Sequence, residues 1–159
     1  MKLHLLRHAK TEPFSDSGKD LDRKLMQKGI LQAENIALYF KSKNFQPTQI
    51  FCSDAARTRQ TIKIVKEGNE FTTVKYLDKL YLAESPKLLS FIWEQKQNEN
   101  LFIIGHNNGL SDLASYFTGE FIDLSTCEYI CISFEIDSWE ETSKGNGTIS
   151  ERYHPKINL

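Results

Sequence analysis

The sequence predicts an α/β fold: a three-layer α/β/α arrangement around a mostly parallel central sheet. Short apolar runs alternate with segments of ten or more residues in which apolar side chains recur at helical spacing. One run, residues 101–104, is apolar throughout, which is typical of a strand covered by helices on both faces. The length of 159 residues fits one domain, so residues 1–159 are expected to form a single unit.

The first part of the chain alternates strand, loop and helix. Residues 3–6 form a short apolar run bounded by charge, which favours a strand. Residues 11–24 are polar and contain a proline and a glycine, so we expect a loop or lid. Residues 26–43 are expected to form an amphipathic helix. Its apolar positions are Ile30, Ala33, Ile36, Ala37 and Phe40.

The middle of the chain repeats this alternation. A second strand is expected at residues 50–52 and a third at residues 73–77. A helix is expected between them, because Ser53 or Asp54 can cap its start and Gly68 marks its end.

The second half continues with two helices and two or more strands. Ser85 is the expected N-cap of a helix that has a proline in its first turn. After the strand at 101–104, a further helix is expected to end at Gly119. Residues 129–137 alternate apolar and other side chains, and the turn at 145–147 leads to a last edge strand.

Composition narrows the class of protein. Hydrophobic residues make up 40% and charged residues 26% of the chain, as in an ordinary globular protein. Lys+Arg 20 against Asp+Glu 21 gives a net charge of -1, which argues against nucleic-acid binding. No apolar stretch approaches the roughly 18 residues of a membrane helix, and the N-terminus does not resemble a signal peptide. The three cysteines form no paired framework, so we expect a reduced, soluble, cytoplasmic protein without membrane contact.

Cationic and imidazole side chains follow the expected parallel strands. Arg7 and His8 come after the first strand, Arg57 after the second, and His106 and Asn107 after the fourth. Because ligands bind beyond the carboxyl ends of such strands, we expect these side chains to converge. Guanidinium groups match phosphate oxygens, so the sequence predicts a site for a phosphate ion or phosphoryl group.

Histidine is the expected nucleophile at this site. The chain has no glycine-rich phosphate loop with a lysine, and no cysteine lies in a Cys-x5-Arg loop. A neutral imidazole can accept a phosphoryl group near pH 7 without a metal. His8, directly after Arg7, fits this role. His4 lies four residues earlier, but a strand followed by a turn does not favour a metal site with His8.

Three segments resemble the histidine phosphatase superfamily, which includes the phosphoglycerate mutases. They are LLRHAKTE at the first strand end, SDAARTRQT after the second strand and IIGHNNGL at the fourth. They occur in order between residues 3 and 113. The short chain and the LDRKLMQKG segment are most similar to SixA-type phosphohistidine phosphatases. The resemblance implies a phosphoglycerate mutase-like fold, minimal and without large cap insertions.

The resemblance also implies roles for individual residues. His8 would be the nucleophile, Arg7 and Arg57 would clamp the phosphoryl oxygens, and His106 would complete the pocket. Larger relatives use a glutamate as proton donor, and Glu84 is the acid in the corresponding region. Glu84 is therefore a candidate catalytic acid or, alternatively, a solvated loop residue. No metal or cofactor is implied.

Three further side chains are candidate substrate contacts. Thr11 and Asn107 can line the pocket, and Thr11 can alternatively cap a turn. Arg23 can lie at the pocket rim or form a surface pair with Asp22.

The expected activity is metal-independent hydrolysis through phospho-His8. Because a short chain leaves the site open, the preferred substrate is phosphohistidine on a protein partner. The alternatives are a small-molecule phosphomonoesterase or mutase, and a non-catalytic module that binds phosphate or a phosphoprotein.

Overall fold

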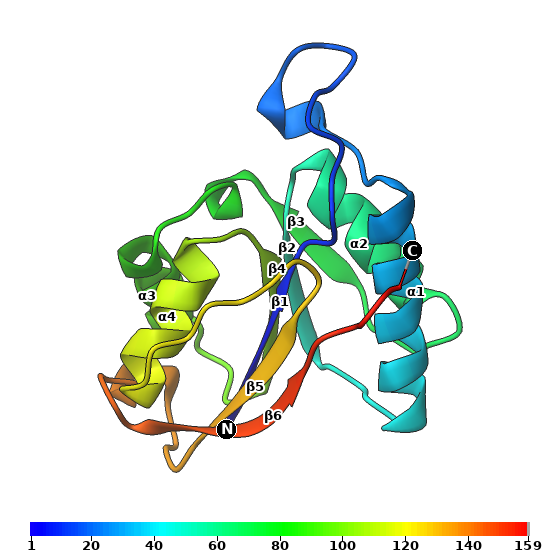
Figure 1. Ribbon diagram of the computed structural model, residues 1–159. Coiled ribbons are helices and arrows are strands. Elements are labelled where there is room, and N and C mark those ends of the chain that lie inside the picture. Colours follow the sequence, from blue (N-terminus) through cyan, green and yellow to red (C-terminus); the bar gives the residue numbers. More distant parts are fainter. Residues whose placement is uncertain (159) are drawn as a thin grey trace.

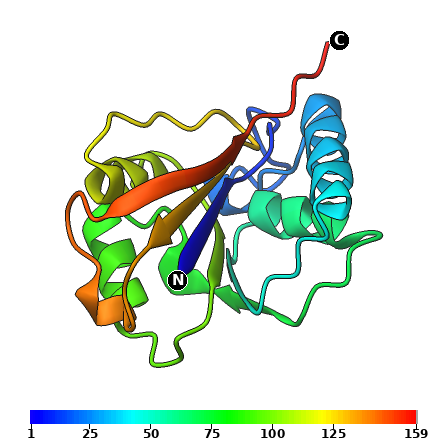
Figure 2. The ribbon, with the colours of Figure 1, turned by 90° about the horizontal axis from the view of Figure 1, so that it is seen from below.

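A six-stranded sheet in the order β3-β2-β4-β1-β5-β6 separates two pairs of helices in the computed structural model, which describes residues 1–158. Helices α1 and α2 cover one face, and α3 and α4 cover the other (Figures 1 and 2). This arrangement confirms the predicted three-layer α/β/α fold. The strands are β1 (Lys2–Arg7), β2 (Gln49–Ser53), β3 (Val74–Leu77), β4 (Leu101–Gly105), β5 (Tyr129–Phe134) and β6 (Gly147–Tyr153). The α-helices are α1 (Gln27–Ser42), α2 (Ala56–Lys66), α3 (Ser85–Trp93) and α4 (Gly109–Thr118), and the short 3-10 turns are η1 (Asp20–Asp22), η2 (Asp78–Leu80) and η3 (Trp139–Glu141).

The sheet is mostly parallel, as predicted. β1 pairs with β4, β4 with β2, and β2 with β3, all in parallel, while β5 and β6 run antiparallel at the other side. The carboxyl ends of the four parallel strands therefore meet at one edge of the sheet. Figure 1 shows the loop of residues 11–24 standing above this edge.

Each face of the sheet packs its own hydrophobic core. Alternate side chains of a strand point to opposite faces. Leu3 and Leu5 of β1 therefore lie in the cluster under α3 and α4, and Leu6 lies in the cluster under α1 and α2. All three leucines are fully buried, and each contributes about 1.5–3 kcal/mol by the hydrophobic effect. β4 is buried along its whole length, as expected for a central strand.

The helix caps differ from the sequence prediction. The residue before α2 is Ala55, which makes no side-chain capping bond. Ser53 and Asp54 do not cap α2, because Ser53 Oγ contacts His106 and the Asp54 carboxylate pairs with Arg59. Ser85 is likewise inside α3 rather than its N-cap. The Ser53 hydroxyl is thus engaged by a partner 53 positions away and the Asp54 carboxylate by one five positions away.

The other predicted boundaries agree with the structure to within a few residues. α4 ends at Gly119, whose φ of 72° is the left-handed conformation that glycine allows. β5 ends at Phe134, three residues earlier than residues 129–137 predict. The last strand, β6, is the expected edge strand after the Gly-Asn-Gly turn.

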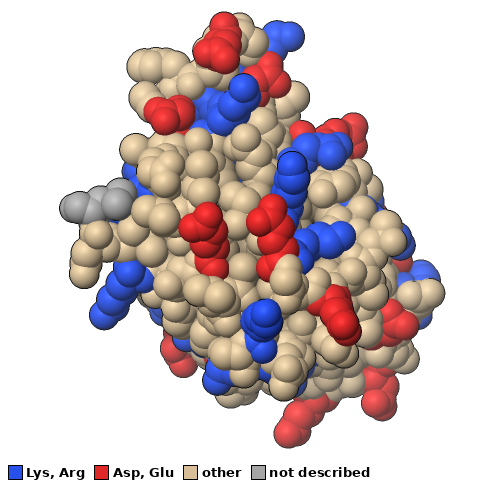
Figure 3. All heavy atoms as spheres, turned by 90° about the vertical axis from the view of Figure 1, so that its right-hand side faces the viewer, with Lys and Arg blue, Asp and Glu red and all other residues tan. Residues whose placement is uncertain are grey.

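Charges of both signs are interspersed on one face of the molecule. Figure 3 shows this for the face that includes α1 and the loop above the sheet edge, where lysines and arginines lie among aspartates and glutamates. Among the helices within residues 1–158, none is both long enough and apolar enough to cross a membrane.

We predict that Gly29→Ala destabilises the protein, against the usual preference of helices for alanine. A Cβ at Gly29 would lie 2.0 Å from the backbone carbonyl oxygen of Lys10, so one of the two segments must move. Alanine normally stabilises a helix interior by about 1 kcal/mol relative to glycine. Overpacking here should instead lower the free energy of unfolding by about 1–3 kcal/mol or more, as measured by urea unfolding.

Gly105→Ala is the matched control for this substitution. The nearest atoms to its Cβ would belong to the Leu110 side chain, at 3.5 Å, which is an ordinary contact. We expect a clearly smaller loss of stability than for Gly29→Ala. A Gly29→Ala variant as stable as the parent protein would contradict the close approach of α1 to the Lys10 backbone.

Candidate active site

The two predicted histidines lie side by side at the carboxyl ends of β1 and β4. Arg7 and Gly105 are partners in the register of these strands, and the next residues are His8 and His106. The backbone N–H of His8 donates to the carbonyl oxygen of Gly105 at 3.1 Å. The two imidazole centroids are 5.3 Å apart. The pairing of two central strands therefore places both rings at one point of the sheet edge.

His8 has the geometry of a nucleophile. Its Nδ1 lies 2.8 Å from the carbonyl oxygen of Ala9. A carbonyl can only accept a hydrogen bond, so Nδ1 carries the proton and Nε2 keeps its lone pair. Burial, followed by the nearby charges of Arg57 and Arg7, lowers the pKa of His8 to about 4. His8 is therefore neutral at pH 7, with Nε2 available to attack.

His106 presents a free ring nitrogen. Its Nε2 lies 2.7 Å from Ser53 Oγ, and its Nδ1 is buried without a protein partner within residues 1–158. Burial, followed by the charge of Arg57, lowers the pKa of His106 to about 3. A buried polar atom without a partner is costly, so this nitrogen is a candidate position for a ligand atom. Ser53 fixes the His106 ring through its hydrogen bond to Nε2.

Two arginines bring positive charge to these rings. Arg57, in the first turn of α2, is buried and donates from Nη1 to the Asp20 carbonyl oxygen at 2.8 Å. Arg7 donates from Nη1 to the Leu124 carbonyl oxygen at 2.7 Å, while its buried Nε has no partner in the described part of the chain. Burial lowers the pKa of Arg7, and the charges of Asp123 and Glu128 oppose that effect. Each guanidinium has five N–H donors, so both retain donors for an anion.

An acid and a tyrosine that the sequence analysis did not single out complete the surroundings. Asp20, in η1, accepts hydrogen bonds from Arg57 Nη2 at 3.0 Å and from the Tyr81 hydroxyl at 2.5 Å. The Tyr81 ring lies 5.6 Å from the His106 ring in an edge-on arrangement. The Tyr81 hydrogen bond, followed by that of Arg23, holds the pKa of Asp20 well below its usual range. The sequence contains one signal for Asp20. Arg23 follows it by three residues in a polar loop, a spacing at which the two side chains can pair.

Arg23 belongs to this cluster rather than to the outer surface. It pairs with Asp20 at 3.0 Å, not with Asp22 as one of the sequence alternatives proposed. Its Nη2 donates to Thr11 Oγ1 at 2.6 Å and its Nε to the Glu12 carbonyl oxygen at 2.9 Å. The Arg23 charge also contributes to the lowered pKa of His8. Arg23 and Thr11 together fasten the loop of residues 11–24 beside the pocket.

Asn107 holds a neighbouring loop in place. Its Nδ2 donates to the Leu124 carbonyl oxygen at 3.1 Å, and its Oδ1 accepts from Ser111 at 2.7 Å. Leu124 also receives the Arg7 hydrogen bond. Asn107 thereby positions the backbone that orients Arg7.

Glu84 stands apart from these contacts. It is exposed and immediately precedes α3. No hydrogen bond or ion pair within residues 1–158 joins its side chain to the two histidines or the arginines. Its role as a proton donor stays a prediction.

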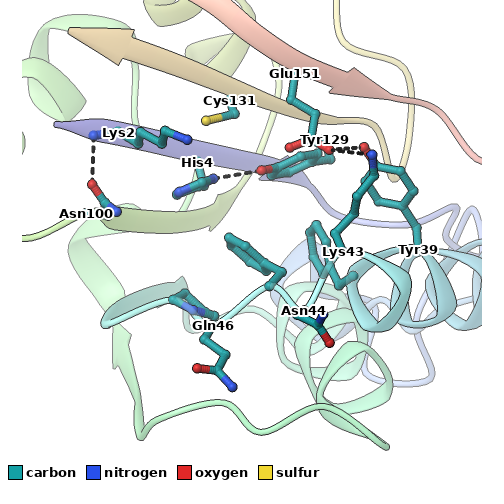
Figure 4. Close-up of a pocket in the computed structure, with 13 residues that line it drawn as sticks. Lys2, His4, Tyr39, Lys43, Asn44, Gln46, Asn100, Tyr129, Cys131 and Glu151 are labelled. Atoms are coloured by element: carbon teal, nitrogen blue, oxygen red, sulfur yellow. Dashed lines mark hydrogen bonds and ion pairs between the residues drawn. The ribbon is translucent and has the colours of Figure 1, made fainter. Parts of the chain in front are cut away.

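His4 and Cys52 are separate from the nucleophile position. His4 lines another pocket, of about 250 Å³, in which its Nδ1 lies 2.7 Å from the Tyr129 hydroxyl (Figure 4). Lys2 and Asn100, from the amino-terminal ends of β1 and β4, line the same pocket, so it lies toward the opposite edge of the sheet. Cys52 is buried, and burial raises the pKa of its thiol to about 12, so it is not a thiolate nucleophile.

Comparison with known proteins identifies the family. Residues 3–81 match the model of the histidine phosphatase superfamily, branch 1. The chain belongs to the histidine phosphatase superfamily. An uncharacterised chloroplast protein of Arabidopsis thaliana is 30% identical, over 88% of this chain and 69% of that protein.

Solved SixA structures share the whole fold. SixA from Agrobacterium tumefaciens has a TM-score of 0.84 and 25% identity, and the match covers 97% of each chain. The protein histidine phosphatase SixA in complex with tungstate has a TM-score of 0.81 and 17% identity, again over 97% of each chain. The likeness confirms the expected phosphoglycerate mutase-like fold of minimal size.

We predict that acidification destabilises the protein between pH 7 and pH 5. The pKa values of His4, His8 and His106 lie at about 4, 4 and 3, against 6.5 for an ordinary histidine. The unfolded chain therefore binds more protons in this range, and the free energy of unfolding falls as the pH falls. Each such histidine contributes about 2 kcal/mol to the loss at pH 5, measured by urea unfolding at both pH values.

His106→Asn removes one of these groups. We expect its pH-dependent loss to be smaller than that of the parent by about 2 kcal/mol. Carboxylates with lowered pKa values change the free energy of unfolding only below about pH 4. They therefore do not affect the comparison between pH 7 and pH 5. Equal stability of the parent at pH 7 and pH 5 would contradict the buried, neutral histidines.

Proposed function

We propose that this protein is a metal-independent phosphatase that forms a phosphohistidine intermediate on His8 and acts on phosphohistidine in a partner protein. The observation that carries the proposal is the hydrogen bond from His8 Nδ1–H to the Ala9 carbonyl oxygen. It leaves Nε2 of the neutral ring without a proton. Buried nitrogens of Arg7 and His106 that have no partner within residues 1–158 come from the same sheet edge. A nucleophile among cationic and neutral donors fits a phosphoryl group.

The first step transfers the phosphoryl group to the enzyme. The lone pair of His8 Nε2 forms a bond to phosphorus while the bond from phosphorus to the leaving atom breaks, and its electron pair returns to that atom. The His8 ring gains positive charge, which the Ala9 carbonyl oxygen stabilises through Nδ1–H. In the second step water attacks phosphorus, the P–Nε2 pair returns to His8, and a proton is released to solvent. Inorganic phosphate and neutral His8 result.

The surrounding donors stabilise the transferring group. Arg7, Arg57 and His106 supply N–H groups for its equatorial oxygens, where charge spreads in the transition state. Arg7 is fixed by Leu124 and Arg57 by Asp20, so little reorganisation is needed during reaction. Loss of one such donor commonly costs 100- to 1,000-fold in rate, on the order seen for oxyanion sites.

Two observations support an anionic phosphoryl ligand on a protein. A SixA structure of the same fold holds tungstate, a tetrahedral oxyanion like phosphate. The loop of residues 11–24 rises above the sheet edge in Figure 1 without extending into a separate capping domain. A phosphoryl group carried on a protruding side chain of another protein suits such a site.

The remaining predicted residues act around the reacting atoms. In this proposal Arg23 adds positive potential at His8, and Thr11 and Asn107 hold the loops that carry their neighbours. Glu84 is proposed as proton donor for ester substrates only. Imidazole leaves phosphorus more easily than an alkoxide, so phosphohistidine does not need this acid.

We predict that metal-free turnover depends on His8. In the presence of a chelator, the protein should hydrolyse p-nitrophenyl phosphate and a phosphohistidine-bearing protein. His8→Asn should lower both rates by about 1,000-fold or more, because the covalent step is lost. Rapid quenching in base should trap acid-labile phosphate on the parent protein and none on His8→Asn.

His154→Asn, a change at an exposed histidine, is the control for this experiment and should retain full activity. Turnover that persists in His8→Asn would exclude the His8 intermediate. A parent protein that binds phosphate but hydrolyses neither substrate would favour the non-catalytic binding module.

We predict a substrate-dependent effect for Glu84→Gln. General acid catalysis contributes roughly 100- to 10,000-fold when the leaving group needs a proton. An alkyl phosphate should therefore lose at least 10-fold in kcat/KM, whereas p-nitrophenyl phosphate and phosphohistidine should change little. Glu94→Gln, at an exposed acid just beyond α3 that pairs with Lys79, is the matched control. Equal rates of parent and Glu84→Gln on alkyl phosphate would rule out Glu84 as the acid.

A further inference from the structure

The Asp20 carboxylate has room for one more hydrogen-bond donor. It accepts from Arg23 on Oδ1 and from Arg57 and Tyr81 on Oδ2. A carboxylate has about four acceptor positions, so the three donors found within residues 1–158 leave one unused. The side chain is 43% exposed, whereas its partner Arg57 is only 3% exposed. Asp20 thus joins the buried arginine of the proposed phosphoryl site to the solvent-exposed surface.

This carboxylate is ionised at neutral pH. The groups that face it are Tyr81 after η2, Arg23 on the same loop and Arg57 on α2, and the hydrogen bonds of all three hold its pKa far below the usual range. His106, on the loop after β4, is near enough for the Asp20 charge to affect its pKa. Asp20 therefore accepts hydrogen bonds but does not supply a proton. A negative charge beside the site repels a leaving group that becomes anionic and attracts one that carries a positive N–H.

Tyr81 provides a flat wall next to this charge. Its ring makes a T-shaped pair with His106 at 5.6 Å between centroids, and the Arg57 guanidinium lies over one face of the ring at 5.8 Å, so the subsite would use the remaining surface of the ring. Aromatic faces attract cations and pack against planar rings. An aromatic wall with an ionised carboxylate at its edge suits a small, flat, cationic ring.

We propose that Asp20 and Tyr81 form a leaving-group subsite that binds the protonated imidazole ring of a phosphohistidine substrate. The proposal rests on the phosphatase function proposed above and adds the form of the substrate that is recognised. The phosphoryl group lies on the arginines, and the ring N–H that is not bonded to phosphorus donates to Asp20. The substrate is then dipolar, negative at phosphorus and positive at the ring. The positive Arg57 and the negative Asp20 form the complementary pair.

The subsite explains how the leaving group departs without a protein acid. His8 Nε2 bonds to phosphorus, the P–N bond of the substrate breaks, and its electron pair returns to the ring nitrogen. Because the other ring nitrogen already holds a proton, the ring leaves as neutral imidazole and no proton is transferred. The Asp20 charge favours the protonated ring and so keeps the reactive form populated at higher pH than in water.

Asp20→Asn tests the subsite, with N-phosphoimidazole and p-nitrophenyl phosphate as probes. We expect kcat/KM for N-phosphoimidazole to fall about 10- to 100-fold, as for a lost hydrogen bond to a charged group. The alkaline limb of its pH profile should also move to lower pH. The loss on p-nitrophenyl phosphate should be clearly smaller, because the Asp20 backbone carbonyl still holds Arg57 and this leaving group becomes anionic.

Two variants serve as controls. Asp22→Asn changes an acid of the same turn, which accepts from Ser17 instead of facing the arginines, and should leave both rates unchanged. Asp20→Glu keeps the charge, and its alkaline limb on N-phosphoimidazole should stay near that of the parent. Thermal unfolding of each variant confirms that the fold is retained.

The outcomes separate this subsite from the proposed function. Equal losses on both probes in Asp20→Asn, with an unmoved pH profile, would mean that Asp20 only holds Arg57, and would overturn the subsite alone. A parent protein that hydrolyses p-nitrophenyl phosphate but not N-phosphoimidazole would overturn the phosphohistidine specificity and the subsite with it. A parent inactive on both would overturn the phosphatase function itself.

Discussion

The parallel pairing of β1 with β4 is the constraint on which the site depends. Arg7 lies opposite Gly105, and the hydrogen bond from His8 to Gly105 continues the ladder one residue beyond the strand. A shift of one residue would send the side chains of β1 to the opposite faces and separate the two imidazoles. The fully buried leucines on both faces of β1 make such a shift costly. The hydrophobic core thus fixes the distance between His8 and His106.

Burial then determines the chemistry of these rings. A protonated imidazole has no free lone pair, so His8 would be a poor nucleophile if its ring were charged. Desolvation and the positive neighbours both disfavour the charged form, so the rings stay neutral. In the proposed reaction the same arginines would attract the anionic phosphoryl group. One set of charges would therefore prepare the proposed nucleophile and bind the group that it attacks.

The sequence predicted those parts of the site that follow strand ends. Arg7, His8 and His106 were found because apolar runs mark strands and parallel strands end at one edge. Asp20 and Tyr81 were missed because they lie in irregular segments without periodicity and meet only through the fold. The predicted cap of α2 was wrong for a related reason: Ser53 is a good local cap, but it bonds His106, which follows β4 and lies 53 positions further along the chain. Local signals were reliable where packing agreed with them and failed where a tertiary partner competed.

The contact between Ser53 and His106 has a consequence for how an anion is recognised. A hydroxyl group can turn to donate or to accept. When Ser53 donates to Nε2, the proton of the neutral His106 ring must sit on Nδ1, the nitrogen without a partner within residues 1–158. In the proposed site His106 would then offer an N–H to a phosphoryl oxygen while remaining uncharged. Rotation of one buried hydroxyl would thus let His106 donate to an anion over a wide range of acidity, with no proton taken up from water.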